Sequence, residues 1–162
     1  MADKSHETHE NSKNKYNFAI QRIYTKDISL EMPQAPAIFA SEWNPEVELN
    51  IKVDHHEISD LLQDGHEVSL EVTLNAKLPN KRTAILIELT QAGIFKITGW
   101  EGEELKRMLG AFCPGIIFPY AREQIADLMT RANLPPFHLA PINFDAFYEQ
   151  RKAQKAAENK TK

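Results

Sequence analysis

The 162-residue sequence predicts an α+β domain in which four antiparallel strands precede helices that pack on one face of the sheet. Two observations carry this prediction. In four segments between residues 24 and 97, apolar and polar residues alternate with a period of two, as in strands that bury one face. From Glu101 onward the apolar residues recur three and four positions apart, which is typical of amphipathic helices.

The first three strand patterns have their carboxylates on the solvent side. In YTKDISLEM, residues 24–32, Ile28 and Leu30 alternate with Asp27 and Glu31, so the two carboxylates share one face. The segments EVELNIKVD, residues 46–54, and EVSLEVTLNAKL, residues 67–78, repeat the alternation and predict the second and third strands. The predicted sheet therefore has an acidic face.

The fourth pattern, RTAILIELTQAGIFKI, residues 82–97, predicts a strand that differs in its two faces. Leu86 and Glu88 fall on the outer face, whereas Ile87, Leu89 and Gln91 fall on the inner one. The loop after the first strand has prolines at 33, 36 and 45 and cannot form regular structure. It nevertheless carries the large apolar residues Ile38, Phe39 and Trp43. The sequence is compatible both with their packing in the core and with their lining a binding groove.

Three helices are expected after the strands. The first begins at Glu101 and is stopped by Pro114 and Gly115; the second begins near Pro119 and covers residues 118–133. The third begins at Asn143, a good N-cap, and places Phe147 on an apolar stripe. Residues 1–15 and 152–162 are polar and are expected to be disordered tails around a single domain of residues 16–151.

Charge and composition exclude several classes of protein. Residues 27–104 hold fifteen acidic and five basic side chains, so this part repels phosphate backbones and nucleic acid is not an expected partner. A basic polypeptide segment would be attracted, although an ordinary solvated sheet surface is the alternative reading. No apolar run approaches the roughly 18 residues that span a bilayer. We therefore expect a cytoplasmic protein with no direct membrane insertion.

No residue pattern indicates catalysis, a metal or a cofactor. The single cysteine, Cys113, is expected at a helix C-terminus, where the helix dipole raises a thiol pKa and disfavours a nucleophile. The histidines at 55, 56 and 66 lack zinc-like spacing, and no phosphate-binding loop of the form G-x-x-x-x-G-K occurs. The protein is therefore not expected to be an enzyme; an enzyme using the carboxylates or Cys113, and a structural or assembly subunit without client affinity, remain as alternatives.

Four segments between residues 20 and 148 resemble the bacterial export chaperone family SecB. They are IQRIYTKDISLEMPQAP, AGIF at 92–95, LGAFCPGIIFPYARE and LAPINFDAFY. The chain departs from the family pattern in the loops at 50–66 and 77–82, at Ala92, and in its basic C-terminal tail.

The resemblance implies a Greek-key sheet, assembly as a homotetramer that is a dimer of dimers, and a function without nucleotide hydrolysis. That function is to hold unfolded precursor polypeptides in an export-competent state and to deliver them to the ATPase SecA.

The resemblance also implies roles for individual residues. Asp27, Glu31, Leu86 and Glu88 would contact the basic zinc-binding tail of SecA, with the zinc belonging to the partner. Ile38, Phe39, Trp43 and Phe147 would line a groove for clients. The helix of residues 118–133, with Ile87, Leu89 and Gln91, would hold the tetramer together.

Overall fold

The computed structural model describes residues 15–160, which fold around one antiparallel sheet. Its strands are β1 (Asn17–Glu31), β2 (Glu46–Glu57), β3 (Gly65–Lys77) and β4 (Thr83–Thr98), in the spatial order β1-β4-β3-β2. Strands β2, β3 and β4 follow one another as hairpins. β1 lies beside β4 and connects to β2 through the long proline-containing loop, in which residues 37–40 form the short 3-10 helix η1 (Ala37–Ala40). This is the predicted Greek-key arrangement.

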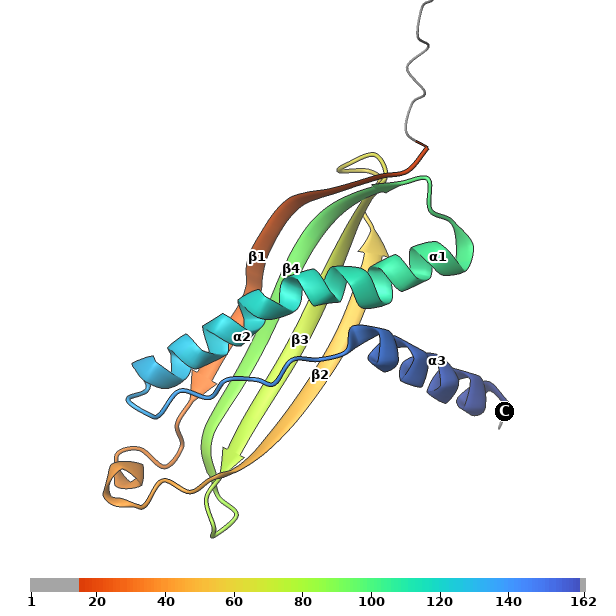
Figure 1. Cartoon of the computed structure of the whole chain (residues 1–162). Coiled ribbons are helices and arrows are strands. Elements are labelled where there is room, and N and C mark those ends of the chain that lie inside the picture. Colours follow the sequence, from red (N-terminus) through yellow and green to blue (C-terminus); the bar gives the residue numbers. More distant parts are fainter. Residues whose placement is uncertain (1–14, 161–162) are drawn as a thin grey trace, which may run out of the picture.

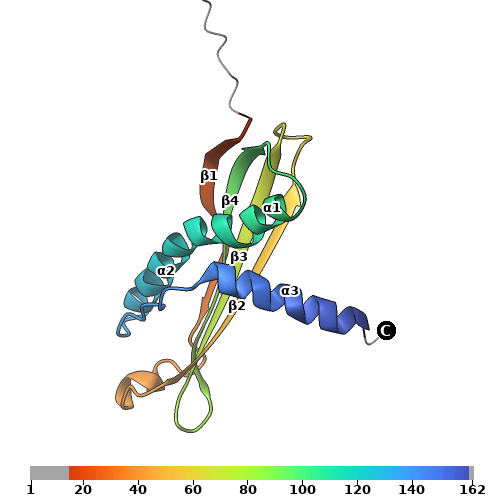
Figure 2. The ribbon, with the colours of Figure 1, turned by 45° about the vertical axis from the view of Figure 1, so that its right-hand side comes forward.

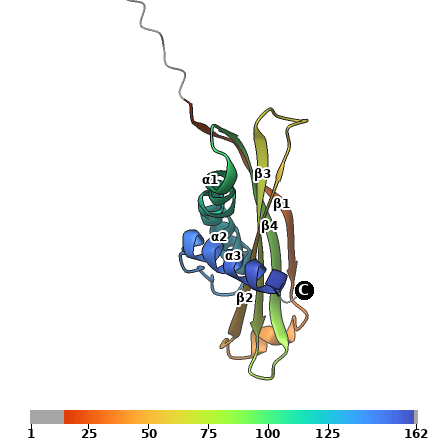
Figure 3. The same cartoon turned by 90° about the vertical axis from the view of Figure 1, so that its right-hand side faces the viewer.

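The helices lie on one face of the sheet, as the sequence predicts (Figures 1 and 3). Helix α1 (Gly102–Arg107), the π-helical turn η2 (Met108–Phe112) and α2 (Cys113–Arg131) follow without a break and cross the strands as one rod. Helix α3 (Phe144–Lys160) lies on the same side, and its C-terminal end extends away from the sheet (Figure 2).

The core forms between α2 and the middle of the sheet. Ile87 and Leu89 of β4 are buried there together with Ile117 and Ile125 of α2. Leu70, Leu74 and Ile85 are also fully buried, so both central strands, β3 and β4, contribute. Each such side chain contributes on the order of 1.5–3 kcal/mol on burial. This contact makes the helix-covered face the interior of the protein.

The expected helix break at Pro114 and Gly115 is wrong. Pro114 instead lies near the start of α2, where the rod continues from η2, so its missing N–H leaves a gap in the helical hydrogen bonding. Pro119, which we expected to start a helix, lies inside α2. The residue four positions before it is Gly115, whose carbonyl oxygen loses its helical N–H donor because proline has none. The π-helical turn before Cys113 marks where the helical hydrogen bonding adjusts to these residues.

The third helix begins as predicted but ends later. The backbone N–H of Ala146 donates to the side-chain oxygen of Asn143 at 3.0 Å, which is the expected N-cap bond. Residues 1–14, most of the predicted N-terminal tail, lie outside the described residues. Residues 152–160, for which we expected disorder, continue α3 as an exposed helix.

The edge strands leave apolar side chains exposed on the helix-covered face. Ile28 of β1 pairs with Leu89, and Leu49 of β2 pairs with Leu74, so both face the helices. Yet Ile28 is 43% exposed and Leu49 is 42% exposed. The alternation correctly assigned the face, but α2 covers only the central strands.

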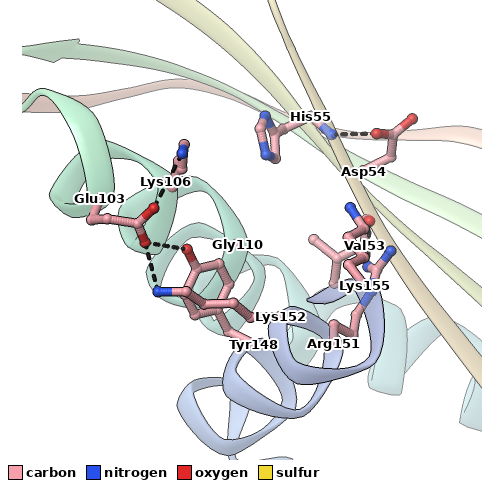
Figure 4. Close-up of a pocket in the computed structure, with 10 residues that line it drawn as sticks. All are labelled: Val53, Asp54, His55, Glu103, Lys106, Gly110, Tyr148, Arg151, Lys152 and Lys155. Atoms are coloured by element: carbon pink, nitrogen blue, oxygen red, sulfur yellow. Dashed lines mark hydrogen bonds and ion pairs between the residues drawn. The ribbon is translucent and has the colours of Figure 1, made fainter. Parts of the chain in front are cut away.

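Helix α3 is held to the α1–η2 segment by one close ring contact and two groups of ion pairs; Figure 4 draws the ring contact and the ion pairs of Glu103. The Tyr148 ring packs over the backbone of Gly110, where a Cβ atom would lie 2.5 Å from Tyr148 Cδ2. Glu103 accepts from Lys106 at 3.1 Å and from Lys152 at 2.9 Å. Arg107 also pairs with Asp145 of α3, at 2.7 Å. The missing side chain at Gly110 is therefore what lets α3 approach.

Replacing Gly110 with alanine should displace Tyr148 and loosen α3. We expect Gly110→Ala to lower the free energy of unfolding by about 1–3 kcal/mol because the added methyl overpacks the contact. Hydrogen exchange should become faster along α3. Gly115→Ala is the matched control, since its Cβ would meet only Phe144 Cδ2 at 4.0 Å. Equal thermal stability of the two variants would contradict this account.

Candidate functional site

An acidic patch lies on the helix-free face of the sheet, which Figure 3 shows edge-on. Its residues are Asp27, Glu31, Leu86 and Glu88, named here the acidic patch. Glu31 pairs with Leu86, and Glu88 pairs with Ser29, which lies between the two carboxylates of β1. Asp27 and Glu31 are four residues apart on one strand, about 13 Å. The three carboxylates thus form a triangle with one apolar side chain at its edge, and the strand register confirms that they share a face.

The carboxylates of the acidic patch form no ion pairs within residues 15–160, unlike three other carboxylates on the same face. Glu46, Glu48 and Glu71 form ion pairs with Lys81, Lys77 and Lys52, at 2.8, 2.7 and 3.4 Å respectively. Within residues 15–160, Asp27, Glu31 and Glu88 have no ion-pair partner, and all three are exposed. Their negative charge is therefore available to a cation from outside the chain.

A second polar cluster on this face was not predicted from the sequence. Glu67 of β3 is only 7% exposed although it points away from the helices. Its carboxylate accepts hydrogen bonds from the Tyr24 hydroxyl and from Lys26 Nζ, the latter at 2.9 Å. His56 Nε2 lies 3.0 Å from the same carboxylate. We name these four residues the Glu67 cluster. The small side chain of Ala92, which pairs with Tyr24, leaves room for the tyrosine to cross β4.

The cluster changes the acidity of two groups. Burial, a hydrogen bond to Glu67 and the charge of Glu67 raise the pKa of Tyr24 to about 12. Burial also acts to raise the pKa of Glu67, but the hydrogen bonds from Tyr24 and Lys26 and the charges of Lys26 and His56 outweigh it, so the pKa is lowered. Glu67 therefore remains ionised at neutral pH and ties β1 to β2 and β3. Nothing in the sequence signals this, because it depends on the strand register.

The raised pKa of Tyr24 predicts a loss of stability at alkaline pH. An unfolded tyrosine ionises near pH 10 and the folded Tyr24 near 12, so the folded state is favoured fully below pH 10 and loses this contribution as the pH rises to 12. Absorbance titration should show one tyrosine ionising near pH 12, and this step should be absent from Tyr24→Phe. Glu67→Gln should move the step to lower pH, because it removes the negative charge. A step that is unchanged in Glu67→Gln would contradict the assignment.

The predicted client-groove residues lie in different surroundings. Trp43 lines a pocket of about 80 Å³ with Val47, Met129 and Phe137, and Phe39 is 52% exposed on η1. Ile38 is buried in the core, and Phe147 lies half-buried on α3, where its ring contacts Phe144. The structure thus does not gather the four side chains into one pocket. Their role in client binding stays a prediction, with Trp43 and Phe39 the accessible members.

The predicted tetramer residues of β4 are buried inside the chain itself. Ile87, Leu89 and Gln91 lie beneath α2, and Gln91 accepts a hydrogen bond from Gln124 of that helix. Their role between protomers stays a prediction. Because they are covered by α2, they could affect such a contact only by positioning this helix, whose outer surface exposes Tyr120.

The remaining candidates for chemistry have structural surroundings. Cys113 is fully buried within a helix, not at a helix C-terminus, and burial raises its pKa to about 12. The thiol is thus poorly suited to nucleophilic attack, as expected but for a different reason. Among residues 15–160, no three histidine, cysteine or carboxylate side chains are placed to hold a metal ion. None of the helices described is long and apolar enough to cross a membrane.

Comparisons with known proteins agree with this architecture. The family model described as "Preprotein translocase subunit SecB" matches residues 11–155. The protein-export protein SecB of Methylococcus capsulatus is 49% identical over 145 residues, covering 88% of this chain and 89% of that protein. The corresponding protein of Marinobacter nauticus is 43% identical over 160 residues, covering 97% of this chain and 94% of that protein.

A solved structure shares the fold at low sequence identity. It is the SecB-like chaperone of Mycobacterium tuberculosis in complex with a ChAD peptide from an antitoxin, with a TM-score of 0.64 and 19% identity over 77% of this chain and 90% of that chain. The matched family model and the two relatives establish that the chain belongs to the SecB family.

Proposed function

We propose that this protein is an ATP-independent holdase chaperone, which keeps precursor proteins unfolded and export-competent and delivers them to the SecA ATPase. Membership of the family supports the chaperone role, since the relatives are protein-export proteins. The observation that supports delivery to a partner is the acidic patch, where three exposed carboxylates have no ion-pair partner within residues 15–160.

The acidic patch suits a basic segment that carries an apolar side chain. Asp27, Glu31 and Glu88 would pair with lysine or arginine, while the half-buried Leu86 offers an apolar contact at the edge of the triangle. A basic zinc-binding tail of SecA has this chemistry. By the strand register the patch lies on the face opposite the helices, so a partner bound there leaves the helix-covered face free for a client.

Client binding is proposed for the helix-covered side, at the end of the sheet that carries η1. There the pocket beside Trp43 has an apolar lining that includes Leu74 and Met129, and Phe39 exposes its ring nearby in the chain. Apolar anchors of this kind bind non-native segments with little sequence preference. Phe147 and Ile38 would then support the groove without being its main contact.

Assembly as a dimer of dimers is part of the proposal. The large apolar side chains exposed on β1 include Ile20 and Ile28, and those on the helical rod are Phe112 and Tyr120. Exposed apolar surface spread over an edge strand and a neighbouring helix is typical of a protein–protein interface. We therefore place contacts between protomers on β1 and on the outer surface of the helical rod.

The holdase activity can be measured by light scattering from a refolding client. The wild-type protein should suppress aggregation stoichiometrically and without ATP. Trp43→Ala should weaken suppression by roughly tenfold in effective concentration, because it removes an anchor at the pocket. Its thermal stability should change less than that of a core variant such as Leu74→Ala. If stability and client affinity fall in step, Trp43 serves only the core; if the wild type gives no suppression, a structural role is favoured.

The acidic patch predicts a salt-dependent affinity for SecA. The triple variant Asp27→Asn, Glu31→Gln, Glu88→Gln should bind SecA roughly tenfold more weakly at low salt, and most of the weakening of binding as salt rises past roughly 0.15 M should disappear. Titration calorimetry at two salt concentrations measures both effects.

The matched control neutralises the paired carboxylates of the same face. Glu46→Gln, Glu48→Gln, Glu71→Gln removes the same number of charges but takes them from existing ion pairs. We expect this control to bind SecA almost as the wild type does, and both triple variants to retain client binding. An equal loss of affinity in the two variants would show that only the overall charge matters.

A further inference from the structure

A hollow of about 360 Å³ lies between the end of β2, the α1–η2 segment and α3 (Figure 4). We name it the α3 pocket. It is separate from the acidic patch, which lies on the other face of the sheet, and its lining does not include Trp43. Neither the proposed partner surface nor the proposed client groove uses it.

Three nitrogen-bearing side chains in the α3 pocket have no carboxylate partner. Arg151 donates to the backbone oxygen of Val53 at 2.7 Å and its guanidinium lies over the Phe147 ring, but it pairs with no acid within residues 15–160. Lys155, one turn further along α3, has no ion pair in the same range. His55 of β2 lines the same hollow (Figure 4).

The acidic groups of the pocket are engaged elsewhere. Glu103 already accepts from Lys106, Lys152 and the Tyr148 hydroxyl. Asp54 accepts the backbone N–H of His55 at 2.9 Å and, by the alternation of β2, points to the opposite face. The cations of α3 therefore face the imidazole without a counter-charge between them.

The electrostatics at His55 reflect this arrangement. Burial lowers its pKa most, and the charges of His66 on β3 and of Lys155 and Arg151 on α3 lower it further, whereas Asp54 raises it. On the α1 side the pocket presents Lys106 and Glu103 as an ion pair, and Lys152 of α3 is held by the same carboxylate. These positive charges disfavour protonation of His55. A bound anion would offset them and would therefore favour the protonated imidazole.

We propose that the α3 pocket binds a doubly charged oxyanion of the phosphate class, between Arg151, Lys155 and His55. Two fixed positive charges and an imidazole that can become a third match a dianion better than a single carboxylate. Arginine and histidine supply directed N–H donors, and lysine supplies a point charge on a flexible stem.

Binding would link α3 to the edge of β2. In the structure that link is the hydrogen bond from Arg151 to the backbone oxygen of Val53, since the ion pairs of α3 reach Glu103 and Arg107 of α1. An anion shared by His55 on β2 and by Arg151 and Lys155 on α3 would add a second connection. The position of Phe147, which lies on the same helix one turn before Arg151, would then depend on the anion.

The test uses the full chain and proton NMR of the histidine rings, with His55→Gln to assign one of the six histidines. Sulfate is the probe because it remains doubly charged across the titration, and sodium chloride holds the ionic strength constant. Sulfate should raise the pKa of His55 by about one unit, and by linkage it should bind roughly tenfold more tightly when His55 is protonated. Inorganic phosphate should act in the same direction.

Two variants of α3 make the result specific. Lys155→Gln should weaken sulfate binding by roughly tenfold, because it removes one of the two fixed charges. Lys160→Gln is the matched control, with the same change of charge at the exposed end of the same helix. An unchanged pKa of His55 in sulfate, or equal weakening in the two variants, would overturn the proposal. A larger response to acetate than to sulfate would overturn the assignment to a dianion.

Discussion

The whole structure depends on the burial of one face of the sheet beneath a single uninterrupted helical rod. Ile87 and Leu89 of β4 and Ile117 and Ile125 of α2 are completely or almost completely buried in this contact. A rod that broke at Pro114 would cover only part of β3 and β4 and leave their apolar residues in water. The rod nevertheless remains continuous through the π-helical turn and past Pro114 and Pro119, so all the helical cover of β3 and β4 lies on one face of the sheet.

With the helices confined to one side, the other face of the sheet is free to carry charge. Its carboxylates include three that pair with lysines, Glu46, Glu48 and Glu71, and the three of the acidic patch, which have no ion-pair partner within residues 15–160. The Glu67 cluster stiffens the same face by connecting strands that are not hydrogen-bonded neighbours. A surface whose side chains are already held in place loses less conformational entropy of its own when it binds.

Helix α3 is attached differently from α2. Only its first turns contact the body, through Phe144, Phe147 and Tyr148, and charged pairs supply much of the remaining contact. Exposed ion pairs contribute little each and weaken with salt, so α3 belongs to the less stable part of the fold. Phe147, a proposed client contact, lies on this element. The anion proposed for the α3 pocket would act on this same helix.

The sequence by itself determined the four strands, their faces and the start of α3, because alternation and an N-cap at Asn143 are local properties. Strand periodicity also placed Asp27 and Glu31 on one face and Glu88 on the outer face of its own strand, whereas the pairing of β1 with β4 is what brings the three together. Only the tertiary structure decided that the helix continues through Pro114 and that Ile38 is buried in the core. It also decided that Ile87 and Leu89 are buried within the chain itself, beneath α2. The Glu67 cluster and the α3 pocket join residues far apart in the chain, and their contacts exist only once register and helix docking are set.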